Sequence, residues 1–332
     1  MYERFYGLHE RPFDLTPDPR FLFLSPQHHE TLVHLKYGLS GRPGITLVVG
    51  DAGTGKTTLI RGALQGLEGS PSRIAMIANP TLTRGEFYDH LAGTFGFSRE
   101  AATSKATFLS ELHASLEACS QAGAVLALIV DEAQSLPSEL LEELRLLTNV
   151  EGTNGQSLTL LMVGQPELAD RLNDPSLRQL KQRVALRANL NPFSLKETAG
   201  YIAARITVAG GRADQVFTRD AVLAIHTASK GLPRVISVLC DNALVTGFAG
   251  NVKPVGSSII AAVCQDFDLP KVAVQEAPPP AAPVPAPPAV HVPAEMVSEP
   301  VTQASADEAS PQLFDSYQAP TKRFSFFKGS RR

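Results

Sequence analysis

Short apolar runs recur along the chain between residues 45 and 190, and the segments between them have apolar residues at a helical period. The runs are ITLVV, RIAMIAN, AVLALIV, SLTLLMV and RVALRANL. Continuous apolar runs of this length are typical of strands that are buried on both faces. Because helical segments separate them, the pattern predicts a mainly parallel sheet covered by helices on both sides.

The pattern changes after Pro192, where the strand signals stop and four helix-like segments follow. We therefore predict an α/β unit over residues 1–192 and a small all-α unit over residues 193–269. Residues 277–300 contain nine prolines, which favour extended polyproline conformations and cannot build a core. The sequence thus predicts a disordered, proline-rich tail over residues 270–332.

Composition narrows the class of protein only slightly. A hydrophobic fraction of 43% is enough for a sizeable core, and a net charge of −3 gives no global basic signal for nucleic-acid binding. The N-terminus lacks a signal-peptide pattern, and the longest apolar run is far shorter than a membrane span, so we expect a cytoplasmic protein. Three widely spaced cysteines lie in apolar, helix-like segments, and we interpret them as buried apolar residues: Cys119, Cys240 and Cys264.

The segment GDAGTGKT lies between the first apolar run and the helix-like TLIRGALQGL, and it matches the phosphate-binding pattern GxxxxGK[ST]. Its glycines let the backbone curl so that successive N–H groups point at phosphates, beside the positive end of the following helix. We expect Lys56 to reach the β and γ phosphates and the Thr57 hydroxyl to ligate Mg²⁺. The expected nucleotide-binding residues of this segment are Gly50, Asp51, Ala52, Gly53, Thr54, Gly55, Lys56, Thr57 and Thr58.

The run AVLALIV leads directly into Asp131 and Glu132, at the carboxyl edge of the predicted sheet. We expect Asp131 to hold Mg²⁺ through a water molecule and Glu132 to polarise the attacking water as a general base. The alternative, an acidic cap on the next helix, is disfavoured by the phosphate loop upstream. The acidic pair, and a sequence without an NKxD-like guanine motif, favour ATP over GTP.

Four further polar residues are candidates for contacts with the γ phosphate. Gln165 follows SLTLLMVG, where it would bond the γ phosphate or the lytic water, or merely form a turn before Pro166. Arg178 and Arg183 precede the last run, and in a ring or filament either would serve as an arginine finger, worth about 10³ to 10⁵ in rate, or be a plain surface residue. Arg234 begins a helix after Gly-Leu-Pro and would couple the two units.

With these motifs in order, the chain resembles an AAA+ ATPase, and more closely the ExeA (GspA, MshM) family of bacterial secretion and pilus ATPases. The resemblance covers nearly all of residues 1–268. Besides the phosphate loop, it is carried by YERFYGLHERPFDLTPDPRFLFLSPQHHETLVHLKYGL, LLEELRLLTNVE, LMVGQPEL, LRQLKQRV and GLPRVISVLCDNAL. It implies a P-loop NTPase fold with a helical lid, and ATP with Mg²⁺ as ligands.

The resemblance also implies a role for each candidate residue. Lys56 and Thr57 match the Walker A motif, Asp131 and Glu132 the Walker B motif, Gln165 sensor 1, Arg234 sensor 2, and Arg178 or Arg183 the finger. The N-terminal segment 1–40, through Tyr37 and Gly38, would line the adenine pocket. The adjacent His28 and His29 point different ways on a helix, so we interpret them as capping or packing residues rather than metal ligands.

The function implied is ATP hydrolysis that drives assembly or remodelling of an envelope complex, in a homo-oligomeric ring or filament. The complex would be a secretion, MSHA-like pilus or exopolysaccharide (exosortase) system. Longer family members continue into a transmembrane helix and a peptidoglycan-binding domain, and the sequence has neither, which favours the shorter pilus or exosortase-cluster type.

Two alternatives stay open. A DNA-associated ATPase of the TniB or TnsC type is disfavoured by the acidic composition. A nucleotide-gated scaffold would tether partners through the tail, with incidental hydrolysis. The basic aromatic end of that tail, PTKRFSFFKGSRR, would dock on a partner, a nucleic acid or an anionic membrane surface, or be a solvated end.

Overall fold

The structure, a computed structural model, describes residues 1–16, 18–40, 44–152 and 155–267. It contains a five-stranded parallel sheet in the order β2-β3-β4-β1-β5. The predicted parallel sheet is thereby confirmed, and the carboxyl ends of all five strands meet at one edge. The strands are β1 (Ile45–Gly50), β2 (Arg73–Ile77), β3 (Leu126–Val130), β4 (Thr159–Gly164) and β5 (Val184–Leu190).

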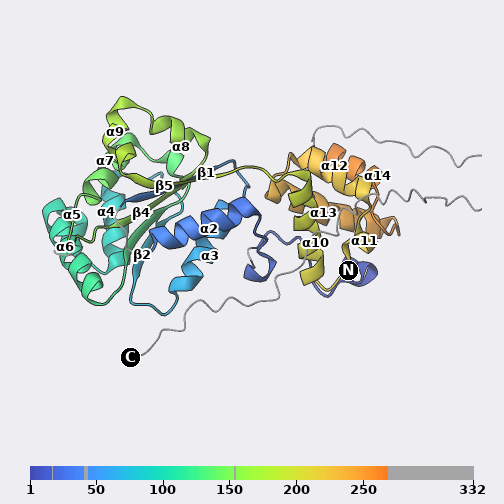
Figure 1. Cartoon of the computed structure of the whole chain (residues 1–332), viewed down its shortest axis with the longest axis horizontal. Coiled ribbons are helices and arrows are strands. Elements are labelled where there is room, and N and C mark those ends of the chain that lie inside the picture. The colour runs from blue at the N-terminus through green and yellow to red at the C-terminus, as the bar shows by residue number, and fades with distance from the viewer. Residues whose placement is uncertain (17, 41–43, 153–154, 268–332) are drawn as a thin grey trace, which may run out of the picture.

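Helices connect the strands and cover both faces of the sheet (Figure 1). Several begin at strong caps: the Ser25 side chain accepts from the His28 N–H, and Thr83 and Glu86 form a capping box. The helices are α2 (Pro26–Gly38), α3 (Lys56–Leu64), α4 (Arg84–Phe95), α5 (Arg99–Thr103), α6 (Lys105–Gln121), α7 (Ser138–Leu147), α8 (Pro166–Arg171) and α9 (Arg178–Gln182), with 3₁₀ turns η2 (Gln65–Leu67), η3 (Ala133–Ser135) and η4 (Pro175–Leu177).

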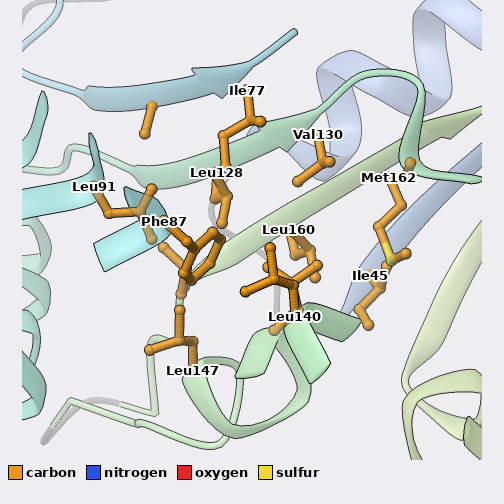
Figure 2. Packing of buried hydrophobic residues seen from close by; sticks show 14 of the residues in the cluster. Ile45, Ile77, Phe87, Leu91, Leu128, Val130, Leu140, Leu147, Leu160 and Met162 are labelled. Atoms are coloured by element: carbon orange, nitrogen blue, oxygen red, sulfur yellow. The ribbon is translucent and has the colours of Figure 1, made fainter. Parts of the chain in front are cut away.

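Alternate residues of each strand enter different cores. In β3, Leu128 and Val130 face the cluster formed with α4 and α7, whereas Ile129 faces the cluster formed with α2 and α3. Figure 2 shows the first cluster, in which Phe87 and Leu91 from α4, and Leu140 and Leu147 from α7, pack on the strands. Full burial of each such side chain stabilises the fold by about 1.5–3 kcal/mol, so the sheet is a rigid support for its carboxyl edge.

The chain after β5 folds into a separate helical unit with its own core (Figure 1). Thr218 caps α12 and Pro233 occupies the first position of α13, which fits its fixed backbone angle. This all-α unit, the lid, was expected from the sequence. Its helices are α10 (Leu195–Val208), α11 (Ala213–Val216), α12 (Arg219–Ser229), α13 (Pro233–Ala249) and α14 (Ser257–Asp266).

The N-terminal segment packs on the lid rather than on the sheet. Tyr2 and Tyr6 of α1 (Tyr2–Tyr6), Phe13, and Phe21 of η1 (Pro19–Phe21) are buried in the lid core. The Tyr2 hydroxyl donates to Asp241 of α13 at 2.5 Å. Residues 1–23, which we assigned to the α/β unit, therefore contribute to the core of the lid, and the chain enters the α/β unit at α2.

Three other features bear on the predictions made from the sequence. No helix in the ranges that the structure describes has the length and hydropathy to cross a bilayer. The predicted tail over residues 270–332 lies outside the described residues. All three cysteines are buried in helices as free thiols: Cys119 in α6, Cys240 in α13 and Cys264 in α14.

Candidate active site

The glycine-rich loop lies at the carboxyl end of β1 and leads into α3. Gly53 and Gly55 adopt φ angles of 85° and 95°, a left-handed region that glycine enters without strain. A Cβ atom at Gly50 would lie 2.7 Å from the Leu190 carbonyl oxygen, so β5 approaches the loop too closely for a side chain there. The loop conformation is thus fixed by both backbone angles and packing.

Lys56, the first residue of α3, is buried and bonded to the loop itself. Its Nζ atom donates to the carbonyl oxygens of Gly50 at 2.8 Å and Asp51 at 3.0 Å. Burial lowers the pKa of Lys56, while the nearby carboxylates of Glu132 and Asp131 act in the opposite direction. The ammonium group is therefore held in the concavity of the loop, where phosphate oxygens would compete for it.

Thr57 and Asp131 meet at the start of α3 and the end of β3. The Thr57 hydroxyl donates to Asp131 Oδ2 at 2.7 Å, and Asp131 is only 4% exposed. A hydroxyl oxygen and a carboxylate oxygen that lie side by side are suitable ligands for Mg²⁺. Among the described residues, no group of three or more His, Cys, Asp or Glu side chains is placed so that it could hold a metal ion.

Glu132 directly follows Asp131 and has an unusual backbone conformation. Its φ angle is 51°, which is uncommon for any residue other than glycine. Its Oε2 atom accepts from Gln134 Nε2 at 2.6 Å and from Gln165 Nε2 at 3.2 Å. The hydrogen bond from Gln134 lowers the pKa of Glu132, against the opposing effect of burial. The structure thus brings together two predicted residues, Glu132 and Gln165.

Gln134 belongs to this group, although the sequence analysis did not select it. Besides bonding Glu132, its Oε1 atom accepts from the Gln165 backbone N–H at 3.0 Å, and its carbonyl oxygen accepts from Arg171 of α8. The available signal was a polar side chain two positions after the candidate base, in DEAQ. The sequence alone does not indicate a role for this position, because its contact with Gln165 exists only once the fold brings the end of β4 beside it.

The lid reaches the loop through the first turn of α13. The Arg234 backbone N–H donates to the Gly53 carbonyl oxygen at 3.3 Å, and Arg234 Cβ would lie 3.1 Å from a Cβ atom at Gly53. The Arg234 side chain is exposed, and within the described residues its guanidinium makes no hydrogen bond or ion pair. Arg234 therefore lies at the loop with its charge free for a ligand.

His28 contacts the loop from the α2 side. Its Nε2 atom lies 2.9 Å from the Thr54 carbonyl oxygen and its Nδ1 atom 2.8 Å from Ser25 Oγ. Burial lowers the pKa of His28, which favours a neutral ring that donates from Nε2 and accepts at Nδ1. The Phe193 ring, just before the lid, lies 5.1 Å away. Sequence reasoning missed this contact with the loop.

Tyr37 and Gly38, at the far end of the predicted adenine segment, lie away from the phosphate loop. Tyr37 is half exposed, and a Cβ atom at Gly38 would overlap Thr46 near the start of β1. Thr46 precedes Gly50 by four strand residues, about 13 Å along β1. It is thus the beginning of α2, with His28, that contacts the loop, and the adenine pocket itself stays a prediction.

The two finger candidates differ in their surroundings. Arg183 Nη1 donates to the Thr148 carbonyl oxygen at the end of α7 at 2.7 Å. Arg178, the first residue of α9, is exposed and makes no side-chain hydrogen bond or ion pair within the described residues. Neither residue is brought into contact with the loop of its own chain. Of these two candidates, Arg178 is the one whose guanidinium has no partner in the described part of the chain.

Comparison with protein families and curated proteins gives two matches. A family model described as an AAA domain matches residues 39–172. General secretion pathway protein A of Aeromonas hydrophila is 39% identical over 249 residues, which is 75% of this chain and 45% of that protein. The chain thus spans about half the length of this curated relative.

The chain is also similar in fold to solved structures. The Aeropyrum pernix ORC2 protein, in ADPNP–ADP complexes, matches with a TM-score of 0.58 at 18% identity, covering 78% of this chain and 72% of that one. Cdc6p from Pyrobaculum aerophilum matches with a TM-score of 0.53 at 15% identity, covering 77% and 70%. At these identities the likeness concerns the fold alone, a P-loop sheet with an appended helical unit.

Proposed function

Because this chain belongs to the AAA family and is related to general secretion pathway protein A, we propose that it hydrolyses ATP to drive assembly or remodelling of a bacterial envelope complex. The complex is a secretion, pilus or exopolysaccharide system, and its components are the partners. The protein acts as a homo-oligomeric ring or filament on the cytoplasmic side, where ATP is available.

The observation that carries the hydrolytic part is one hydrogen-bonded group at the carboxyl edge of the sheet. Thr57 bonds Asp131 at 2.7 Å, and Glu132, the next residue, bonds Gln165 at 3.2 Å. Asp131, Glu132 and Gln165 follow the ends of two neighbouring strands, β3 and β4, and Thr57 lies at the start of α3. A cradle for phosphates, a metal-binding pair and a candidate base therefore adjoin, which is the arrangement that phosphoryl transfer to water needs.

Each residue has a defined task in the proposed reaction. The loop N–H groups and Lys56 bind the β and γ phosphates of ATP. Thr57 and Asp131 hold Mg²⁺, which when bound neutralises charge on the phosphate oxygens. Glu132 accepts the proton of the attacking water at its carboxylate, and Gln165 orients the γ phosphate or that water.

The lid couples this chemistry to motion. Arg234 is the second residue of the 17-residue helix α13, which is part of the lid core, and its backbone N–H already contacts Gly53. A γ phosphate in the loop attracts the Arg234 guanidinium and holds the lid on the α/β unit. Hydrolysis removes this attraction, so the lid angle follows the nucleotide state.

The first test compares Lys56→Ala with Glu132→Gln. We expect Lys56→Ala to abolish ATP binding, because the loop loses its only long cation. We expect Glu132→Gln to bind ATP like the wild type but to hydrolyse it at least about 100-fold more slowly, since general bases typically contribute that much. Titration with a fluorescent ATP analogue and a phosphate-release assay measure the two properties separately. Near wild-type turnover of Glu132→Gln would overturn the assignment of the base.

A further inference from the structure

We propose that Gln134 is a positioning residue for the candidate base. It fixes the Glu132 carboxylate so that one oxygen is anchored and the other faces the reaction. This inference rests on the proposed ATPase function. It assigns a role to a residue that has no task in the reaction as proposed above. Gln134 would act through Glu132 and would not touch the nucleotide.

The first step of the argument is the asymmetry of the Glu132 carboxylate. Both amide donors, Gln134 at 2.6 Å and Gln165 at 3.2 Å, bond the same atom, Oε2. Within the described part of the chain, the Oε1 atom has no hydrogen-bond partner. A base anchored through one oxygen keeps the other available to take a proton from water.

The second step is that Gln134 is itself fixed. Its Oε1 atom accepts from the Gln165 N–H at 3.0 Å, and its carbonyl oxygen accepts from Arg171. A Cβ atom at Gly164 would lie 2.7 Å from Gln134 Oε1, so the amide packs where β4 carries no side chain. Because the Gln134 amide oxygen is hydrogen-bonded at the end of β4, the NH₂ group of the same amide points toward Glu132.

The third step is the backbone of Glu132. A left-handed φ of 51° is disfavoured for a residue with a side chain, and it persists only where surrounding contacts hold it. Asp131 Oδ1 accepts from the Glu132 N–H at 2.9 Å and holds the backbone, while the amide of Gln134 holds the far end of the side chain. Without the amide, the side chain would sample other rotamers and leave the reactive position.

The sharpest test is Gln134→Glu. Glutamate has almost the same shape and keeps an acceptor for the Gln165 N–H, but it replaces the donor to Glu132 by a repelling carboxylate. We expect kcat to fall about 10- to 100-fold, a part of what a general base contributes, with the ATP Kd unchanged. The control is Gln121→Glu, which makes the same charge change at the exposed end of α6.

A double variant shows whether Gln134 acts through the base. Added to Glu132→Gln, the Gln134→Glu change should cause no further loss in single-turnover hydrolysis, because the positioned group is already gone. Wild-type kcat in Gln134→Glu, a raised ATP Kd at unchanged kcat, or an equal loss in the Glu132→Gln background would each overturn the inference. If the wild type itself hydrolyses no ATP, the proposed function fails instead.

Discussion

At the scale of single residues, His28 shows how a side chain outside the phosphate-binding pattern can shape the phosphate loop. It is 4% exposed and joins the Thr54 carbonyl oxygen to Ser25 at the start of α2. A Cβ atom at Gly55 would lie 3.4 Å from its Nε2 atom, so the ring packs directly on the loop backbone. One imidazole therefore supports the loop backbone at Thr54 and Gly55.

We predict that His28→Ala weakens ATP binding about tenfold, because a buried carbonyl oxygen loses its donor, a loss of about 1–2 kcal/mol. Calorimetric titration with ATP and Mg²⁺ measures the affinity, and thermal unfolding shows whether the fold survives. The exposed neighbour His29→Ala is the matched control and should change neither property. Equal ATP affinity in His28→Ala and wild type would show that Thr54 needs no support.

The two finger candidates give a second prediction at this scale. Because Arg178 is exposed and Arg183 is bonded within its own chain, we expect Arg178→Ala to reduce kcat about 10³-fold in the oligomer without lowering the melting temperature. Arg183→Ala should instead lower the melting temperature, with a smaller effect on kcat. ATPase assays on mixed oligomers with Lys56→Ala subunits test action between subunits. The reverse result would assign the finger to Arg183.

At the scale of elements, the strands were predictable and several contacts were not. The central strands β1, β3 and β4 are apolar runs because both faces of the sheet are buried there, so their sequences carry the whole signal. Gln134 and His28 carry no such signal, because their partners, Gln165 and Thr54, are 31 and 26 residues away. Tyr2 and Phe21 are large aromatic residues that suit the core of either unit. The hydrophobic period shows that they are buried but does not show in which of the two cores.

The helices on one face of the sheet are tied together by a buried carboxylate. Glu143 of α7 is 5% exposed, and its Oε2 atom accepts from Lys105 Nζ of α6 at 2.6 Å and from the Tyr88 hydroxyl of α4 at 2.5 Å. Its Oε1 atom pairs with Arg84 at 2.8 Å. One residue thus connects α4, α6 and α7, the last of which follows the candidate base in sequence.

We predict that Glu143→Gln destabilises the fold by about 2 kcal/mol, because the buried donors lose their charged partner. Urea unfolding measures the difference from wild type. Glu139→Gln is the control: that carboxylate is 63% exposed and 3.8 Å from Arg84, so its loss should cost under about 0.5 kcal/mol. A similar loss in both variants would mean that burial of Glu143 adds nothing.

The same variant has a pH signature. Burial alone would raise the pKa of Glu143, but the hydrogen bonds from Lys105 and Tyr88 lower it overall, below its ordinary value of 4.5. A carboxylate with a lowered folded pKa contributes stability above its unfolded pKa and loses it as pH falls through the folded pKa. The stability difference between wild type and Glu143→Gln should therefore be constant near neutral pH and shrink below about pH 4.

At the scale of the whole molecule, the chain links the two units beside the phosphate loop. The N-terminal segment packs in the lid and then enters α2, whose first turn bonds the loop through His28. The chain returns to the lid at Phe193, whose ring lies beside His28, and α13 meets Gly53. A change in the loop conformation can therefore reach the lid through the start of α2, through the chain at Phe193 and through the contact of α13 with Gly53.

Two variants distinguish the effect of bound ATP from the effect of lid position. Capture of partners by each variant tests which of the two controls partner binding. Glu132→Gln should hold ATP with the lid drawn onto the γ phosphate, whereas Arg234→Ala should hold ATP without that attraction. Pull-downs from envelope extracts with each variant and ATP should retain partners at least about tenfold better with Glu132→Gln, the ratio for a coupling of 1.4 kcal/mol. Equal retention would mean that partners respond to bound ATP alone. Retention of duplex DNA in place of envelope components would redirect the function toward nucleic acid.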